Sequence, residues 1–165
     1  MNLLGDRLQV CGRCHRFGCC PTPSLSSLLN LSRILLITFS PTRGLILMCN
    51  FDMATVPPEM RKIRRVVVVS PKSYNKRKSM SVPGKCIVVP FSASQPRTQL
   101  ASHVAIADKS YDSLTKQVWA ICEMVTHVSH ARLDRVASGR KFLSESMNAN
   151  DLARIEDALR HSLGL

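Results

Sequence analysis

Short apolar runs alternate with polar loops from residue 44 to residue 126. Their length and their content of valine, isoleucine and phenylalanine predict strands. Five strands are expected, over 44–51, 66–69, 85–91, 103–107 and 117–126. The four consecutive valines of 66–69, closed by Ser70 and Pro71, predict a strand that is buried on both faces. In the last run, Trp119, Ile121 and Val125 are expected to reach the core.

The end of the chain predicts a helix. Asn148 or Asn150 can cap its start, and Gly164 can end it in the left-handed conformation. Apolar residues recur there at helical spacing, at Leu152, Ile155, Leu159 and Leu163. A helical turn is also expected over 129–134. Many short strands followed by one helix predict an α+β, mainly β fold, a small β-barrel or strongly bent sheet with a helix packed on it.

Residues 1–40 are interpreted as a poorly ordered extension, which a start codon assigned too far upstream would explain, and 41–165 as the domain. The apolar stretch 25–39 is shorter than the roughly 20 residues of a membrane span. Four of the seven cysteines gather early in the chain, at Cys11, Cys14, Cys19 and Cys20. Their spacing lacks the two separated ligand pairs of a structural zinc site, so no metal site is expected. Free cysteines within apolar runs suit a reducing cytoplasm.

The charge balance points to a polyanionic partner. The net charge is +12 and the sequence pI is about 9.9, which favours nucleic acid over an anionic membrane surface. Aromatic residues make up only 5% of the chain, so phosphate contacts would have to supply most of the affinity. From Arg61 to Lys85 every charged residue is positive, which predicts a surface of one sign, while the carboxylate of Glu59 stands just before it.

Several short motifs follow one another in a recognisable order. A strand introduced by Gly44 ends in Cys-Asn-Phe at 49–51, and Pro-Glu-Met-Arg-Lys follows at 58–62. Val-Val-Val-Ser-Pro then stands at 67–71 and Val-Val-Pro-Phe-Ser at 88–92. In order and spacing, 41–165 resembles the PemK/MazF family of toxins from type II toxin–antitoxin systems. The resemblance implies an SH3-like barrel, a homodimer, cleavage of single-stranded RNA without metal or cofactor, and a cognate antitoxin as partner.

The resemblance also implies roles for individual residues. The family's arginine before the valine strand falls on Arg64, with Arg65 at the position of the usual proline. The family's threonine at the end of the third strand falls on Ser92, with Ser94 as the alternative, and its acidic residue falls on Glu59. The expected RNA-binding residues are Arg61, Lys62, Arg65, Lys72, Lys76, Arg77, Lys78 and Ser94.

The chemistry of these residue types suits RNA cleavage. The 2′-hydroxyl of RNA can act as nucleophile, so the protein has to stabilise the extra negative charge on phosphorus and position the reacting groups. The planar fork of Arg64 can bind two phosphate oxygens and keeps its charge at neutral pH. Ser92 can donate a hydrogen bond to the same phosphate. Glu59 and a second arginine both stay open as the group that takes the 2′-hydroxyl proton.

Other interpretations stand beside this one. Arg64 and Arg65 could hold surface phosphates only, Ser92 could be a turn residue, and Glu59 could pair with Arg61 or Lys62. His103, His127 and His130 are expected to be structural. As alternatives to the nuclease, the resemblance leaves a non-enzymatic DNA gyrase poison that acts through the terminal helix, an inactive nucleic-acid-binding module and a decayed toxin.

Overall fold

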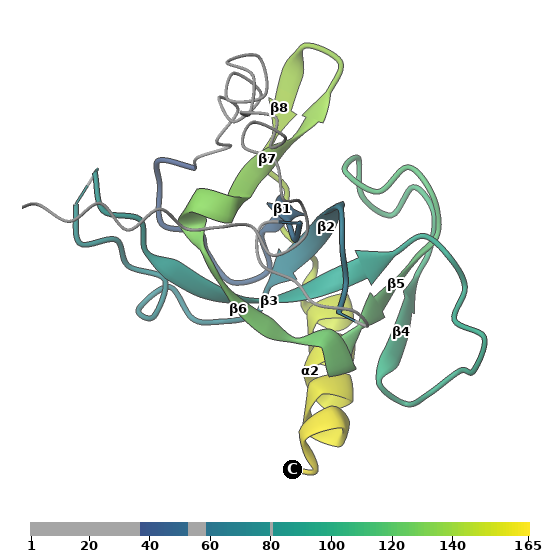
Figure 1. Ribbon diagram of the computed structural model, residues 1–165. Coiled ribbons are helices and arrows are strands. Elements are labelled where there is room, and N and C mark those ends of the chain that lie inside the picture. The colour runs from purple at the N-terminus through teal and green to yellow at the C-terminus, as the bar shows by residue number, and fades with distance from the viewer. Residues whose placement is uncertain (1–36, 53–58, 80) are drawn as a thin grey trace, which may run out of the picture. The chain divides into compact units, whose positions relative to one another are not determined.

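Eight strands and one α-helix are formed by residues 37–52, 59–79 and 81–165, the part of the chain that the computed structural model describes (Figure 1). The strands are β1 Ile46–Asn50, β2 Ile63–Val68, β3 Lys85–Ser92, β4 His103–Ile106, β5 Val118–Ile121, β6 Thr126–Ser129, β7 Leu133–Ser138 and β8 Lys141–Leu143. Two short 3₁₀ helices, η1 Cys122–Met124 and η2 His130–Arg132, and the helix α2, Ala149–Leu163, complete the fold.

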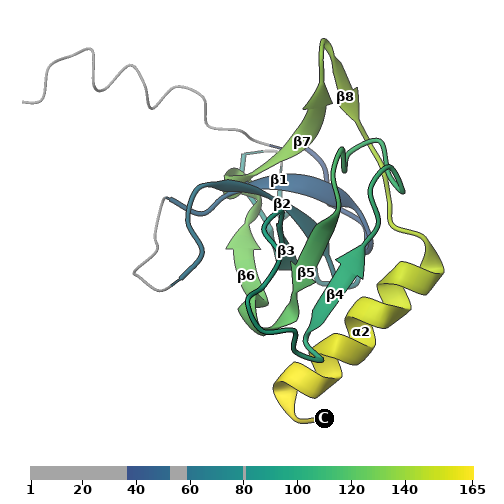
Figure 2. The same cartoon turned by 90° about the vertical axis from the view of Figure 1, so that its right-hand side faces the viewer.

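All strand pairs are antiparallel, and the strand order is β4-β5-β3-β2-β1-β7-β8. The central strand β3 also pairs with β6 through its first residues, Lys85 to Val88, and with β5 through its last, Phe91 and Ser92. The sheet therefore bends along β3. Helix α2 packs against β4 and η1 and lies beside β4 in Figure 2. This confirms the predicted mainly β fold with a C-terminal helix.

The valine strand separates two layers of the core. Val66 and Val68 pack on one face with Leu133 and Val128. Val67 packs on the other face among the residues that α2 covers. Successive side chains of a strand point to opposite faces, so a run of valines fills both layers. Residues 66–68 are each 0% exposed, and the prediction of a strand buried on both faces is confirmed.

The expected strand over 117–126 was wrong in its middle. The chain pairs with β3 as β5, leaves the sheet as η1, and returns to β3 as β6. The interruption lets this segment follow the bend of β3. Of the expected core residues, Ile121 is buried and Val125 packs against the core, whereas Trp119 is half-buried; Val118 and Ala120 are buried in addition. The β7–β8 hairpin was not predicted, because only its first strand carries buried side chains.

The packed unit begins earlier than the expected boundary at residue 41. Ile37 is 2% exposed, and its backbone N–H donates to the carbonyl of Leu133. Phe39 packs against the same core layer. Residues 1–36 of the expected extension, with the early cysteines Cys11, Cys14, Cys19 and Cys20, lie outside the described residues. Within the described ranges, no helix is both long enough and apolar enough to cross a membrane.

Helix α2 is anchored by its first turn. The side chain of Asn148 accepts a hydrogen bond from the N–H of Asp151 at 2.8 Å, and Gly164 ends the helix with φ of 70°, as predicted. The buried hydroxyl of Tyr111 donates to Asp151 Oδ2 at 2.7 Å and accepts from the N–H of Asn148 at 3.1 Å. Burial and the hydrogen bond to Asp151 raise the pKa of Tyr111 to about 12.

Replacement of Tyr111 by Phe removes this hydroxyl and leaves the ring. We expect the free energy of unfolding to fall by about 1–2 kcal/mol, because Asp151 Oδ2 keeps only the Asn148 side-chain amide as donor and the N–H of Asn148 loses its acceptor. Urea unfolding followed by circular dichroism measures the change. Tyr74→Phe is the control: Tyr74 is 42% exposed, and a change within about 0.5 kcal/mol is expected. Equal effects of the two variants would show that the Tyr111 hydroxyl does not anchor α2.

His130 is a buried titratable group beneath the loop that joins β2 to β3. It is 0% exposed, and its backbone N–H donates to the carbonyl of Gly84 at 2.9 Å. Burial lowers the pKa of His130, repulsion from Arg77 adds to this, and a backbone contact with Lys85 opposes it. The folded protein therefore takes up this proton less readily than the unfolded chain does.

We expect stability to be full above about pH 6.5, where the unfolded histidine is neutral, and to fall with pH below it. The slope should reach at most about 1.4 kcal/mol per pH unit. Urea unfolding between pH 7.5 and 5.5 measures it. His130→Leu should flatten this profile, whereas His127→Gln, which changes an exposed histidine, should leave it unchanged. An identical slope in wild type and His130→Leu would show that His130 does not cause the loss of stability at low pH.

Candidate functional site

Arg64 stands near the start of β2, where the strand leaves the valine core. Its strand neighbour on β1 is Cys49, and strand alternation puts its side chain on the face of Val66 and Val68. The guanidinium is half-buried, and its Nε donates to the carbonyl of Arg61 at 3.2 Å. This bond uses one donor of the fork and leaves the outer nitrogens, Nη1 and Nη2, as the donors for an anion.

Ser92 stands at the end of β3, on the neighbouring strand. The β2–β3 pairing ends at Val66 and Pro90, and the same antiparallel register extended by two residues would set Arg64 opposite Ser92. Both side chains thus belong to the same face and the same end of the β2–β3 pair. The Ser92 hydroxyl donates to the carbonyl of Ser94 at 3.0 Å and accepts from the Ser94 N–H at 3.2 Å. A local turn therefore holds this hydroxyl in place.

An aromatic side chain accompanies Ser92. Trp119 of β5 pairs directly with Ser92, and residues that face each other across an antiparallel pair have Cβ atoms about 5 Å apart. The indole is half-buried. Sequence reasoning assigned Trp119 to the core and missed this position, because the register that places it beside Ser92 is set by long-range pairing.

Arg65 does not share this arrangement. It pairs with Met48, and strand alternation directs its side chain to the face opposite that of Arg64. The arginine is half-buried, and its Nε is buried without a hydrogen-bond partner. Arg64 and Arg65 therefore do not present their guanidinium groups to one phosphate. Arg61, Lys62 and Ser94 are exposed at the same end of the strands as Arg64.

Glu59 lines a separate hollow near this end of the sheet. The cavity has a volume of about 400 Å³, and Arg132 and Glu123 also line it, whereas Arg64 and Ser92 do not. The Nε of Arg132 donates to the carbonyl of Asn50 at 2.9 Å, and its guanidinium carbon lies 5.7 Å from the centre of the Phe51 ring. Its Nη2 is buried without a hydrogen-bond partner. Arg132 is a cation that the search for site residues in the sequence missed.

The second carboxylate of this cavity, Glu123, is held in its ionised form. Its Oε1 lies 2.6 Å from Nε2 of His103. Burial by itself would raise the pKa of Glu123, but hydrogen bonds from its own backbone, His103 and Ser102 outweigh burial and hold the pKa below its usual value. His103 thus has the structural role that was expected of it. A carboxylate with a lowered pKa is a weak proton acceptor.

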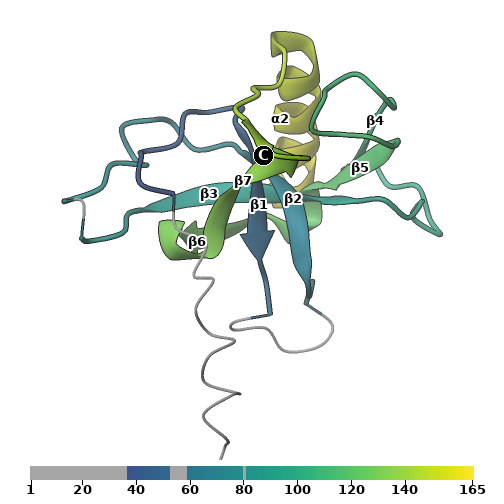
Figure 3. The ribbon, with the colours of Figure 1, turned by 90° about the horizontal axis from the view of Figure 1, so that it is seen from above.

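The expected surface of one charge sign divides into two groups. Arg61, Lys62 and Arg64 lie where β2 begins, whereas the cations of the β2–β3 loop lie at the other end of β3. Strand β3 has 8 residues, so at about 3.3 Å per residue its ends lie up to about 23 Å apart. Figure 3 shows the long β3 and the loops at its two ends.

The loop cations themselves differ in role. Lys72, Lys76 and Lys78 are exposed. Arg77 is half-buried and anchors the loop, because its guanidinium donates to the carbonyls of Ile37 and Ser79 and its backbone N–H to Ser40 Oγ. Arg77 was expected to bind RNA, but these bonds hold its side chain against the protein.

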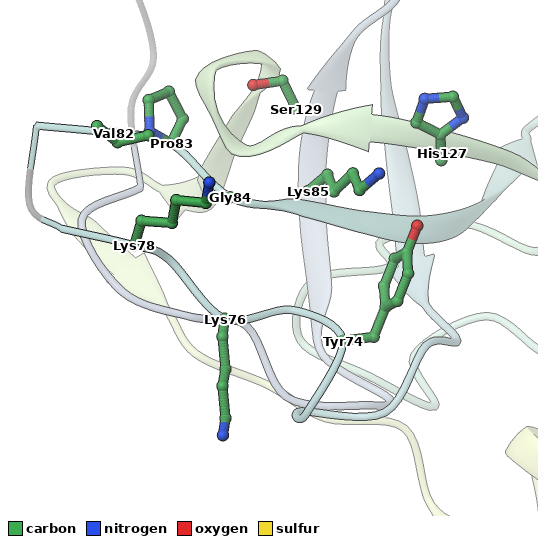
Figure 4. Close-up of a pocket in the computed structure, with 9 residues that line it drawn as sticks. All are labelled: Tyr74, Lys76, Lys78, Val82, Pro83, Gly84, Lys85, His127 and Ser129. Carbon is green, nitrogen blue, oxygen red and sulfur yellow. The ribbon is translucent and has the colours of Figure 1, made fainter.

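A second hollow, named here the loop pocket, lies beside this loop (Figure 4). Its lining residues are Tyr74, Lys76, Lys78, Val82, Pro83, Gly84, Lys85, His127 and Ser129. Tyr74, Lys85 and His127 were not among the predicted site residues, because Lys85 starts a strand and His127 arrives from β6. Throughout the described part of the chain, no three His, Cys, Asp or Glu side chains are grouped so that they could hold a metal ion.

Comparison with known proteins places the chain in a family. The family model for the PemK-like, MazF-like toxin of type II toxin–antitoxin systems matches residues 42–163. The chain is also similar to YifN of Escherichia coli (strain K12), at 32% identity over 148 residues, which cover 77% of this chain and 94% of that protein.

Solved structures share the fold. MazF from Deinococcus radiodurans aligns with a TM-score of 0.56 at 19% identity, over 77% of this chain and 99% of that one. The toxin MazF-mt6 of Mycobacterium tuberculosis aligns with a TM-score of 0.52 at 13% identity, over 73% of this chain and 97% of that one. The family match covers both ends of the β2–β3 pair and helix α2, and the chain belongs to the PemK-like, MazF-like toxins of type II toxin–antitoxin systems.

Proposed function

We propose that this toxin is a metal-independent endoribonuclease that cleaves single-stranded RNA by attack of the 2′-hydroxyl on the neighbouring phosphate. The observation that carries the proposal is the strand register from Val66–Pro90 to Val68–Val88, which, extended by two residues, supports a position of Arg64 and Ser92 on one face and at one end of the β2–β3 pair. A guanidinium and a hydroxyl at such a position form a donor set for one phosphodiester. The similar mycobacterial structure is that of an endoribonuclease, aligned with a TM-score of 0.51 at 19% identity.

The proposed chemistry needs few groups. The 2′-oxygen forms a bond to phosphorus, its proton passes to a base, and the 5′-oxygen leaves and takes up a proton. The products are a 2′,3′-cyclic phosphate and a 5′-hydroxyl. Arg64 stabilises the negative charge that builds on the phosphate oxygens. Ser92 adds a hydrogen bond to one of them when its hydroxyl proton turns from the Ser94 carbonyl to the phosphate. The ring of Trp119, beside Ser92, offers a surface for the base next to the cut.

The carboxylates near the site differ in their fitness as the base. Glu123 has a lowered pKa and a hydrogen bond to His103, so it accepts a proton poorly. Glu59, on the same cavity, precedes β2 on the segment that leads to Arg64. We therefore assign Glu59 as the proton acceptor. Arg61 and Lys62 would contact the RNA backbone at this end, and Lys72, Lys76 and Lys78 would contact it at the other.

We also propose an antitoxin as the second partner. An endoribonuclease from a mycobacterial species, similar to this chain at a TM-score of 0.51, has been solved with its cognate antitoxin. The net charge of +12 favours an antitoxin segment that is acidic, because such a segment can wrap a cationic surface and cover the RNA site. Assembly of the toxin as a homodimer belongs to the same proposal.

The central test is an RNA digest in EDTA with wild type, Arg64→Ala and Arg65→Ala. Wild type should leave 5′-hydroxyl ends. Arg64→Ala should lower the rate at least 100-fold, because it removes the charge that stabilises the transition state. Arg65→Ala, the matched control on the opposite face, should retain the rate within about tenfold. Equal losses in both variants, with unchanged circular dichroism, would refute the role of Arg64.

A second candidate function is non-enzymatic inhibition of DNA gyrase through helix α2. The observation that favours it is the apolar surface at the helix end, where Leu163 is 61% and Leu165 is 85% exposed. A supercoiling assay distinguishes the two functions. Inhibition of gyrase by protein that leaves RNA intact would favour the poison, whereas RNA cleavage with unimpaired supercoiling would favour the nuclease.

A further inference from the structure

The loop pocket combines positive charge with an aromatic ring. Its volume is about 460 Å³, and no carboxylate is among its lining residues. In Figure 4 the side chains of Lys78 and Lys85 extend along the pocket, Tyr74 stands below Lys85, and Lys76 points away from the other residues. The charge of the pocket therefore comes chiefly from Lys78 and Lys85, on two separate segments of the chain.

The ring of Tyr74 is available to a ligand. Tyr74 is 42% exposed, and the ammonium group of Lys85 lies 5.8 Å from the centre of its ring. An exposed ring next to an ammonium group can receive a flat base on its face while the cation binds the neighbouring phosphate. The exposed His127 stands on the other side of Lys85 and adds hydrogen-bonding nitrogens.

The pocket is held in shape although a loop forms one wall. Asn75 is 0% exposed, and its Nδ2 donates to the carbonyls of Pro41 at 2.9 Å and Ser70 at 3.1 Å. The floor is equally close-packed: a Cβ atom at Gly84 would lie 2.7 Å from the carbonyl oxygen of Lys76 and 2.8 Å from the ring of His130. Because these contacts hold the loop at Asn75 and Gly84, a ligand meets a wall that is already formed there.

Further hollows lead from the loop pocket toward the candidate cleavage site. A neighbouring cavity of about 530 Å³ shares Tyr74, Lys85 and His127 with it. That cavity in turn shares Val125 and Thr126 with the hollow that Glu59 lines. The three hollows thus follow β6, which pairs with β3 from Lys85 to Val88, and lead from the loop to η1 and Glu59. An extended polymer can lie along this path, whereas a compact ligand would fill only one hollow.

We propose that the loop pocket is a second binding site for single-stranded RNA, separate from the cleavage site and holding one nucleotide of the same strand. Tyr74 stacks on the base, and Lys78 and Lys85 bind the adjoining phosphates. The pocket lies at the opposite end of β3, up to about 23 Å along the strand from Ser92, so the nucleotide it holds is several positions away from the cut. This inference rests on the proposed function for the identity of the strand.

The experiment measures binding without cleavage. Fluorescein-labelled DNA oligonucleotides of 4 and 14 nucleotides lack the 2′-hydroxyl and stay intact, and their binding to the full chain is followed by anisotropy. The longer oligonucleotide should bind at least tenfold more tightly to wild type, because only it reaches both sites. Tyr74→Ala and Lys85→Gln should each remove most of this gain, and Lys85→Gln should lower the slope of log K against log salt by about 1.

Two variants serve as controls. Tyr74→Phe keeps the ring and should keep the affinity for the longer oligonucleotide within about twofold. Lys141→Gln removes an exposed cation on β8, away from the pocket, and should change neither affinity nor length dependence. Thermal unfolding of each variant establishes that it is folded. If Tyr74→Ala is unstable, the double variant with Lys78→Gln and Lys85→Gln replaces it. This double variant is expected to lose the tighter binding of the longer oligonucleotide in the same way.

The outcomes separate this inference from the proposed function. Suppose that the protein cuts RNA and that Tyr74→Ala and Lys85→Gln still bind the longer oligonucleotide more tightly than the shorter one. This result would overturn the role of the loop pocket and leave the nuclease proposal intact. Suppose instead that wild type does not cut RNA and that these variants lose the tighter binding of the longer oligonucleotide. This result would support the pocket as a nucleic-acid site and overturn only the nuclease proposal. If hexaglutamate binds wild type but not Lys85→Gln while oligonucleotide binding is the same in both, the pocket belongs to a protein partner and the inference fails.

Discussion

The antiparallel pairing of β2 with β3 is the constraint on which the rest of this structure depends. Its register joins Val66 to Pro90 and Val68 to Val88, and the side chains of these paired residues are buried on both faces. A shift by one residue would exchange the two core layers and move Arg64 to the opposite face of the sheet. Because both faces are buried, such a shift is costly, and the position of the candidate phosphate site is fixed by the packing of valines.

The same pairing separates the cations of the chain. The strands run antiparallel, so the loop that connects them stands at the end opposite to Arg64 and Ser92. Positive charge is thereby presented at both ends of a rigid element about 23 Å long. An extended polyanion suits this spacing better than a compact one, since each end can neutralise a different part of the polymer.

Several buried polar groups hold the loop end in shape. Asn75 donates to the carbonyls of Pro41 and Ser70, and Gly84 lets the loop pack against His130. The guanidinium of Arg77 donates hydrogen bonds to backbone carbonyls instead of facing solvent. These contacts show why a count of positive residues overstates the binding surface: a cation that satisfies buried carbonyls contributes to folding and is not available to a ligand.

The sequence by itself determined the local features: the valine strand, the capped helix α2 and the order of motifs that marks the family. Each depends on neighbouring residues, through β-branched runs, helical spacing, Asn148 and Gly164. The tertiary structure decided the rest. It broke the expected strand over 117–126 at η1, placed Trp119 beside Ser92, turned Arg65 away from Arg64 and brought Tyr74 to Lys85. These positions follow from pairing between distant segments, and a residue's own neighbours in the chain carry no information about which strand will lie beside it.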